Sequence, residues 1–347
     1  MHYCKNYDPA SAGSDYGIPL VTEYAPSSDY SKYPGRSSLK ETFDFIVKDL
    51  EQASNLVGIQ GEAQSAYITL DVVEALKARV YLEMEDYQNA AAAAQGLINS
   101  KRYTLISDGD AYKKMWLNDV GTEAIWQFAM SKTETGSNAL GSSFMGIVDK
   151  LPRPSYLPVK SVLNFYDKEN DIRYDAYFTT GLIDRQVGDD IEVTYCSKWP
   201  GNPELYEGKS NNVNKLKAFR ISEMYLIAAE AYAMLNQEDK ASEMLNELKK
   251  IRIKGWTETV YNGAALMQEI QDERVRELFA EGNRLFDMKR WKIGMKRSSS
   301  DAQRDDYLPA LGTDIEKEAT DNRWVWPIPK DEMDSNPQLK GQQNPGY

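Results

Sequence analysis

Histidine is almost absent from this sequence: His2, next to the amino terminus, is the only one among 347 residues. A Ser-His-Asp triad, a Cys-His pair, a zinc site built on histidines and a histidine general base all need an imidazole held in place. Residues near a terminus are the part of a chain that is least often fixed. The composition therefore argues against all of these catalytic classes.

Cysteine is nearly as scarce, with Cys4 and Cys196 as the only two. Two residues are too few for a disulfide framework and lie too far apart for a C-x-x-C motif. Nothing in their spacing favours a bridge, so we expect both to be unpaired. They do not indicate a cellular compartment.

Long apolar runs and an excess of positive charge are also missing. No stretch approaches the roughly 18 apolar residues that a membrane-spanning helix needs. The 53 Asp and Glu residues outnumber the 41 Lys and Arg residues, for a net charge of -12. This charge repels phosphate backbones and anionic lipid headgroups, so nucleic acid is not an expected partner.

The usual motifs of phosphate, nucleotide and metal chemistry do not occur. There is no GxxxxGK[ST] loop, no GxGxxG after a strand and no GxSxG elbow. The run Asp108-Gly109-Asp110 lacks the spacing and terminal Glu of a calcium loop, so we interpret it as a solvated turn. The sequence predicts no cofactor and no metal site.

Helical periodicity is the main pattern that is present. Ser38 and Glu41 have the spacing of a capping box and open an amphipathic stretch over 38–56. Residues 69–99 and 219–252 each predict a helical hairpin, since apolar residues recur at helical spacing on both sides of a turn.

The two hairpins share a register that is typical of tetratricopeptide repeats. A small residue, a tyrosine three positions later and an alanine nine positions after that recur at Ala78, Tyr81, Ala90 and at Ala229, Tyr232, Ala241. Small residues are expected where helices cross closely. The pattern predicts an all-α scaffold, in the main, of tetratricopeptide-like helix pairs with long decorating loops and a few short strands.

The remaining segments complete a single domain over 1–347. Residues 1–36 are expected to be irregular, a long helix is expected over 263–291, and 123–128 alternates like a short strand. The predicted loops are 131–143, 150–158 and 296–322. We divide the domain into a first helical section (38–99), a loop-rich ligand-side region (100–218), a second helical section (219–293) and a closing segment (294–347).

Acidic and basic residues crowd the predicted helix over 263–291, where Glu273, Glu277 and Glu281 form an i, i+4, i+8 column. One interpretation is a carboxylate pair for glycoside hydrolysis, or a metal site. The other is a structural Arg/Glu network that clamps this helix to the second hairpin, with Arg220, Glu223 and Glu230 as partners. We favour the network, because buried charges are retained when they are paired.

Tyrosine is abundant, at 22 residues, together with 7 Trp and 9 Phe. Many of these rings lie outside the helical faces, and for each one alone packing of a loop against the scaffold is the expected role. As a set they also offer a flat platform on which a sugar ring could stack. These outlying rings include Tyr112, Trp116, Tyr156, Tyr166, Tyr174, Tyr177, Tyr195, Trp199 and Tyr206.

Three motifs follow one another along the chain. They are Arg220-Ile221-Ser222-Glu223-Met224-Tyr225-Leu226-Ile227-Ala228-Ala229-Glu230-Ala231; then Glu273-Arg274, Glu277-Leu278, Glu281-Gly282, Arg284, Asp287 and Arg290-Trp291; then Trp326-Pro327-Ile328-Pro329, Asn336-Pro337 and Asn344-Pro345-Gly346-Tyr347. In this order they resemble the SusD/RagB family of nutrient-binding outer-membrane lipoproteins. Upstream, Gly17-Ile18-Pro19-Leu20-Val21 and the Asp49-Leu50 helix fit the same order.

The resemblance implies a non-enzymatic protein that captures oligosaccharides, less often other nutrients. It implies a lipid anchor at the bacterial outer membrane and a seat on a SusC-like, TonB-dependent transporter that imports the ligand. Family members begin with a lipoprotein signal and further helices that have no counterpart before Gly17, and Cys4 follows no apolar run. We therefore expect a domain without its N-terminal part, with an exposed apolar face where those helices pack.

The family's ligand residues vary and lie in loops, so none is transferred by motif. From position alone, we expect the 131–158 loop to bind the glycan, with Phe144, Arg153 and Tyr156 as the contacting residues, whereas Tyr195 and Trp199 should pack. Two alternatives stay open. One is a helical-repeat scaffold that grips a protein partner, and the other is a glycoside hydrolase that uses Glu273 and Glu277.

Overall fold

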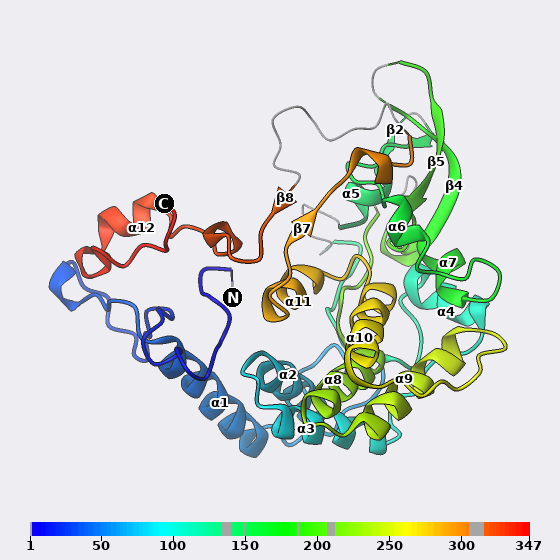
Figure 1. Ribbon diagram of the computed structural model, residues 1–347. Coiled ribbons are helices and arrows are strands. Elements are labelled where there is room, and N and C mark those ends of the chain that lie inside the picture. Colours follow the sequence, from blue (N-terminus) through cyan, green and yellow to red (C-terminus); the bar gives the residue numbers. More distant parts are fainter. Residues whose placement is uncertain (1, 134–139, 149, 186–187, 207–211, 305–315) are drawn as a thin grey trace.

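Two helical hairpins form the centre of the molecule, and their bounds match the predicted ones. The computed structural model describes residues 2–133, 140–148, 150–185, 188–206, 212–304 and 316–347 (Figure 1). Helix α3 packs along α8, so the two hairpins join into one layer, and α10 covers α8 and α9. The elements are α2 (Leu70–Glu83), α3 (Tyr87–Asn99), α8 (Ile221–Met234), α9 (Glu238–Arg252) and α10 (Gly263–Glu277). The mainly helical fold is confirmed.

Alanines occupy the closest approaches between these helices, as the repeat register predicts. Ala78, Ala90, Ala229 and Ala241 are fully buried in the main core. The tyrosines of the register are partly buried and pack against the same core. A side chain of one carbon lets two helix backbones approach, whereas a larger one would hold them apart.

Helix α1 (Leu39–Leu56) precedes the hairpins and packs against α2. Its capping box is complete: Ser38 Oγ accepts the backbone N–H of Glu41 at 3.1 Å, and a Glu41 carboxylate oxygen accepts the N–H of Ser38 at 2.8 Å. Two backbone donors that the helix cannot satisfy itself are thereby paired. Leu39, Phe43 and Leu50 form its buried face.

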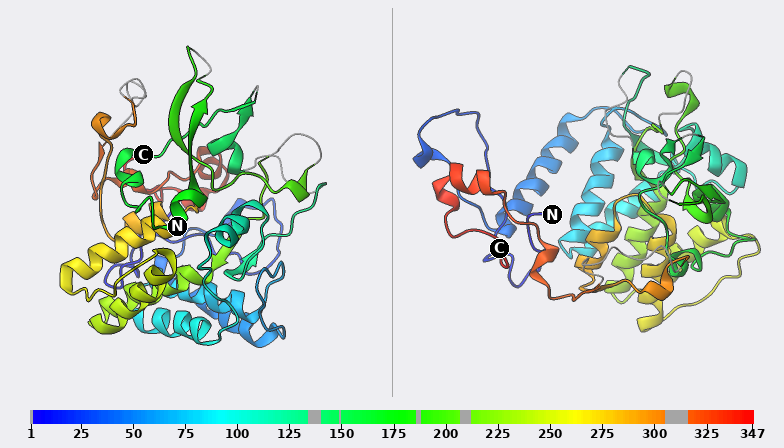
Figure 2. Two further views of the ribbon diagram at one scale, coloured as in Figure 1. Left: turned by 90° about the vertical axis from the view of Figure 1, so that its right-hand side faces the viewer. Right: turned by 90° about the horizontal axis from the view of Figure 1, so that it is seen from above.

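Short strands pair into antiparallel two-stranded sheets. The predicted strand over 123–128 is present, whereas the β4–β5 hairpin, which projects from the helical body in Figure 2, was missed. The pairs are β1 (Ala124–Gln127) with β6 (Lys217–Arg220), β2 (Ile147–Val148) with β3 (Leu151–Pro152), β4 (Phe178–Ile183) with β5 (Ile191–Cys196), and β7 (Met295–Lys296) with β8 (Glu316–Lys317).

Short helices hold the region between the hairpins and the end of the chain. Asp108 is the N-cap of α4, and its side chain accepts the N–H of Ala111; the predicted solvated turn is therefore the exposed start of a helix. The region around α4 and α7 has its own buried aromatic cluster, described below. These helices are α4 (Gly109–Leu117), α5 (Leu140–Met145), α6 (Lys160–Leu163), α7 (Ile172–Tyr177), α11 (Arg284–Arg290) and α12 (Lys330–Ser335).

The prediction of one continuous helix over 263–291 was wrong. Helix α10 ends at Glu277, Ala280 and Gly282 take positive φ angles of 57° and 86°, and α11 starts at Arg284. Side chains from the β5–β6 connection bind the carbonyls at the break: Lys198 Nζ donates to Phe279 O, and the Trp199 indole N–H donates to Ala280 O. Glu281 therefore leaves the column that it would share with Glu277.

The first and last segments of the chain lie side by side (Figure 1). The Arg36 guanidinium donates to the carbonyl of Gly17 at 2.8 Å and, at the other end of the sequence, to Gln342 O at 3.0 Å and Asn344 Oδ1 at 2.8 Å. The irregular 1–36 segment is thus held by specific contacts. Both cysteines are buried and unpaired, as predicted.

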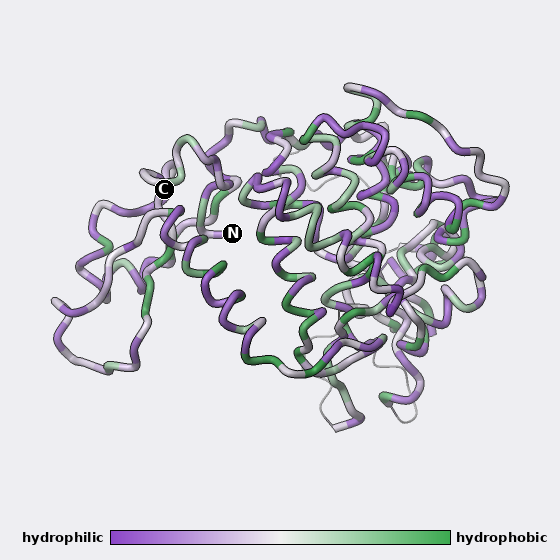
Figure 3. The backbone as a smooth tube through the Cα atoms, turned by 90° about the horizontal axis from the view of Figure 1, so that it is seen from below, coloured by the Kyte–Doolittle hydropathy of each residue, from purple (hydrophilic) through white to green (hydrophobic). Residues whose placement is uncertain are grey.

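Hydrophobic residues recur along the helices between hydrophilic ones, as Figure 3 shows. This distribution suits a helix that buries one side against its neighbours. Among the described residues, no helix is long and apolar enough to cross a membrane.

Candidate functional site

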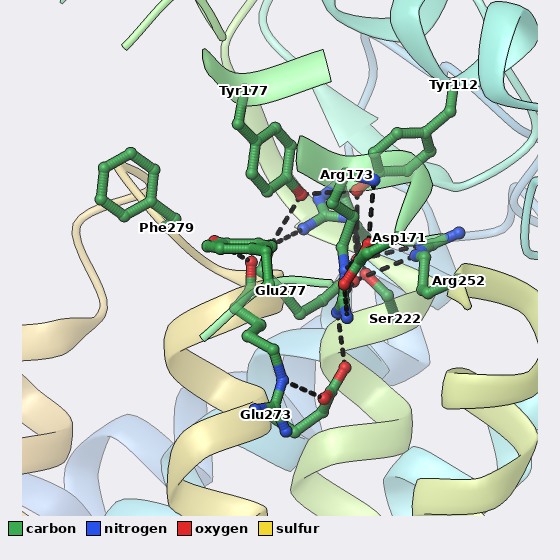
Figure 4. A network of polar contacts seen from close by, with 12 residues as sticks. Tyr112, Asp171, Arg173, Tyr177, Ser222, Arg252, Glu273, Glu277 and Phe279 are labelled. Carbon is green, nitrogen blue, oxygen red and sulfur yellow. Dashed lines mark hydrogen bonds and ion pairs between the residues drawn. The ribbon is translucent and has the colours of Figure 1, made fainter. Parts of the chain in front are cut away.

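Glu277, the last residue of α10, is the centre of a buried charge network (Figure 4). Arg252 of α9 donates through Nε and Nη2 to its two carboxylate oxygens, at 3.0 and 2.9 Å. Arg220 of β6 donates through Nη1 at 2.8 Å, and Arg173 of α7 through Nη1 at 3.0 Å. All four side chains are at most 1% exposed, so the charges are paired away from water.

Neighbouring carboxylates balance the same arginines. Glu273 accepts bonds from Arg173 and from Arg276, the second at 2.7 Å. Glu123, which precedes β1, accepts from Arg252 at 2.8 Å and from Arg220 at 3.1 Å. The network therefore ties α7, β6, α9 and α10 to one another.

The electrostatics of these carboxylates exclude them as catalytic groups. Burial alone would raise the pKa of Glu273, but the charges of Arg173 and Arg276 outweigh it and lower the pKa to about 2. In the same way Arg252 and Arg220 hold the pKa of Glu277 well below its usual range against burial. A glycosidase needs an acid with a raised pKa beside an open cleft. The structural network is confirmed, and the hydrolase interpretation of this pair was wrong.

A second cluster fastens α11 to the two hairpins. Arg290 donates to Glu230 of α8 through Nε and Nη2, both at 2.9 Å, and to Glu83 of α2 at 2.8 Å. The predicted partners Arg220 and Glu230 are thus confirmed. Glu223 was assigned wrongly, because it pairs with Arg79 of α2 and not with the α10–α11 segment.

Two of the three predicted ligand residues lie together. The rings of Phe144, in α5, and Tyr156 have their centroids 6.3 Å apart with planes tilted by 54°. Tyr156 is 65% exposed, whereas Phe144 is partly buried against the aromatic cluster. The Arg153 guanidinium is held by Asp184, with Nε 3.1 Å from Oδ2, and its backbone N–H donates to Gly146 O. Their contact with a ligand stays a prediction.

Helix α5 owes its position to a glycine. A Cβ atom on Gly141 would lie 2.2 Å from the carbonyl oxygen of Trp199 and 2.6 Å from that of Asn212. Backbone atoms cannot move aside as a flexible side chain can, so only glycine fits this approach. Part of the predicted ligand loop, residues 134–139, lies outside the described residues.

Most of the other outlying aromatic rings pack, as their individual interpretation predicts. They form a cluster whose rings meet mainly edge to face, and the Lys198 ammonium lies 3.9 Å from the Tyr177 ring centroid and 4.2 Å from that of Trp116. The predicted packing of Tyr195 and Trp199 is confirmed, since both are buried. The buried cluster contains Tyr112, Trp116, Tyr166, Tyr177, Phe178 and Trp199.

The structure also contains a cavity of about 490 Å³ that the sequence analysis does not predict. It lies between α2, β6, α8 and the 278–287 segment, and its walls hold both apolar and charged side chains. No sequence signal points to it, because its walls come from segments far apart in the chain. Among the described residues no cluster of His, Cys, Asp or Glu could hold a metal ion.

Known proteins resemble this chain in sequence and in fold. The SusD family matches residues 180–347. A SusD superfamily protein from Bacteroides thetaiotaomicron superposes with a TM-score of 0.77 at 27% identity, over 99% of this chain and 74% of that one. These matches support membership of this chain in the SusD/RagB family.

Further relatives match this chain in sequence or in fold. Two SusD-like proteins of Formosa agariphila are 25% and 22% identical over 93% and 80% of this chain, which spans 69% and 59% of their lengths. A SusD-like carbohydrate binding protein from Bacteroides vulgatus has a TM-score of 0.73 at 19% identity, over 98% of this chain and 74% of that one. The tetratricopeptide-like helix pairs of this protein therefore form a scaffold that it shares with these solved structures.

Proposed function

We propose that this SusD/RagB family protein binds oligosaccharides without transforming them. The observation that carries the proposal is the exposed Tyr156 ring beside Phe144 on the loop-rich side of the scaffold. A family relative described as a carbohydrate binding protein supports the ligand class. Glu273 and Glu277 are both buried in ion pairs with arginines. Neither can therefore act as the general acid that glycoside hydrolysis needs.

A sugar ring can make both apolar and hydrogen-bonding contacts with this surface. A pyranose presents a C–H face that packs on an aromatic ring, and equatorial hydroxyls that seek hydrogen bonds. The Tyr156 ring supplies the apolar surface. The Arg153 guanidinium, which pairs with Asp184, is about one-third exposed and can donate hydrogen bonds to hydroxyl groups.

The proposed role is capture of a glycan at the outer face of a bacterial outer membrane and its delivery to a SusC-like, TonB-dependent transporter. Attachment would come from a lipid anchor rather than from a spanning helix. Family membership supports this role. Binding without turnover suits a protein that passes its ligand on unchanged.

The experiment is electrophoresis of the purified protein in native gels cast with a panel of neutral and acidic polysaccharides, with assay of each mixture for reducing sugar. We expect retardation by one class of polysaccharide and no release of reducing ends. Release of reducing ends that grows with protein concentration would contradict the proposal, as would the absence of retardation across the panel.

A further inference from the structure

The 490 Å³ cavity adjoins the predicted ligand residues through one tryptophan. Trp199 lines the cavity, and the backbone of the same residue is the surface against which Gly141 of α5 rests. Phe144 lies on that helix. Trp199 therefore connects the wall of the cavity to the helix that carries Phe144.

One buried donor in the cavity wall has no acceptor. Arg274 lines the cavity and is 4% exposed. Its Nε and Nη2 donate to Asp287 at 3.0 and 2.7 Å, but its Nη1 is buried without a hydrogen-bond partner among the described residues. A buried donor left unpaired destabilises the protein, so this nitrogen is suited to a ligand that accepts a hydrogen bond.

Two more donors in the same wall are unused. Arg79 is fixed by Glu223, through Nε at 2.8 Å and Nη2 at 2.7 Å, and its Nη1 makes no hydrogen bond within the part of the chain that the structure describes. Its side chain is 33% exposed, so that nitrogen is available. The Asn283 side chain does not cap α11, and it makes no other hydrogen bond to the described residues.

The carboxylates of the wall, in contrast, are already neutralised. Glu83 and Asp287 face Arg290 at 2.8 and 2.9 Å, and Glu281 faces Lys198 at 2.8 Å. The apolar part of the wall includes Leu82, Ile227, Leu278, Phe286 and the 44% exposed ring of Phe128. The cavity thus combines spare hydrogen-bond donors with an apolar surface, and its acids do not present free negative charge.

We propose that this cavity binds an acidic sugar residue, one that carries a carboxylate or a sulfate ester, with Arg274, Arg79 and Asn283 as donors to the oxyanion. This inference rests on the proposed function and specifies the ligand class. Arginine is suited to oxyanions because its planar fork of N–H groups matches their geometry. The net charge of -12 opposes such a ligand at long range, so recognition depends on these local donors.

The test is calorimetric titration of the intact protein with matched pairs of oligosaccharides. The carboxylate probes are trigalacturonate and trimannuronate, each with its methyl ester. The sulfate probe is a carrageenan tetrasaccharide with its desulfated form. We expect one acidic form to bind at least about tenfold more tightly than its neutral counterpart, since hydrogen bonds to charged groups contribute roughly 1.5–3 kcal/mol. The preference should shrink as salt is added.

Variants assign the preference to the cavity. Asn283→Ala and Arg79→Gln should each weaken the acidic form about three- to tenfold and leave the neutral form unchanged. Arg274→Lys, which keeps the charge but lacks Nη1, should do the same if it folds. Asn55→Ala, on the exposed side of α1 and away from the cavity, is the matched control.

The outcomes separate this inference from the proposed function. Equal affinity for acidic and neutral forms, or a preference that survives both Asn283→Ala and Arg79→Gln, would overturn the acidic-sugar site. Neutral glycan binding that depends on Tyr156 would at the same time leave the proposed function standing. Failure of every glycan, neutral and acidic, would overturn both.

Discussion

Arg252 and Glu277 face each other in a two-point ion pair, with Nε 3.0 Å from one carboxylate oxygen and Nη2 2.9 Å from the other. Both side chains are fully buried. The pair joins the end of α9 to the end of α10, and Arg220 and Arg173 join β6 and α7 to the same carboxylate. This one carboxylate therefore fixes the segments that support the loop-rich side.

Removal of one arginine from this cluster should destabilise the whole domain. Arg252→Met leaves Glu277 and Glu123 with less positive charge in a dry environment, and we expect a loss of about 3–5 kcal/mol in the free energy of unfolding. Urea titration followed by circular dichroism measures it. Lys40→Met, which breaks the exposed pair with Asp44, is the control and should change nothing measurable. Equal stability of the two variants would show that the buried network around Glu277 does not stabilise the domain.

The stability of the protein should fall as the solution is made acidic. The pKa of Glu273 is about 2 in the folded protein against an ordinary value of 4.5, so between these values the unfolded chain binds more protons. Its contribution, about 3 kcal/mol by linkage, is complete above pH 4.5 and is lost as the pH falls toward 2. The pKa values of Glu277, Glu281 and Asp287 are also lowered by arginines, against burial, and add to the effect.

Glu83 acts in the opposite sense, because burial raises its pKa above the usual value, and it offsets part of this loss. Thermal unfolding at pH 7, 5, 4 and 3 measures the balance. We expect a steep fall in Tm below pH 4.5, and a shallower one in Glu273→Gln, which removes one of the titrating groups. A constant Tm from pH 5 to pH 3 would show that these carboxylates are not held by the arginines.

Gly141→Ala should weaken glycan binding without touching the ligand. The added Cβ would collide with the backbone carbonyls of Trp199 and Asn212, so α5 must shift and carry Phe144 away from Tyr156. We expect a several-fold loss of affinity with little change in the far-ultraviolet spectrum. Gly13→Ala is the control, because nothing lies within 4 Å of its added Cβ. Unchanged affinity in Gly141→Ala would mean that α5 does not position the site.

Helices and helix pairs were predictable where the residues that determine them lie close together in the sequence. The capping box at Ser38 and the alanine register of the hairpins each report a contact within a helix or between adjacent helices. The break after Glu277 was not predictable, because the groups that bind its carbonyls, Lys198 and Trp199, lie about 80 positions upstream. The periodic charged residues over 263–291 therefore predict one continuous helix, since the sequence pattern contains no sign of these distant donors.

The candidate binding surfaces were likewise predictable only where their residues are close in the sequence. The Phe144–Tyr156 pair joins residues close in sequence, and loop position was enough to suggest it. The cavity is built from α2, β6, α8 and the segment after α10, so no local pattern reports it. The free nitrogen of Arg274 becomes visible only once its partner Asp287 is placed.

The most direct test of the account is the affinity of three proteins for the polysaccharide that retards the wild type: wild type, Tyr156→Ala and Tyr24→Ala. Tyr156 and Tyr24 are both exposed, at 65% and 94%, so neither change should alter stability. We expect roughly a tenfold or greater loss of affinity for Tyr156→Ala, because a stacking ring is removed, and no loss for Tyr24→Ala. Equal affinity of all three would contradict the assignment of the glycan site to the Phe144–Tyr156 surface.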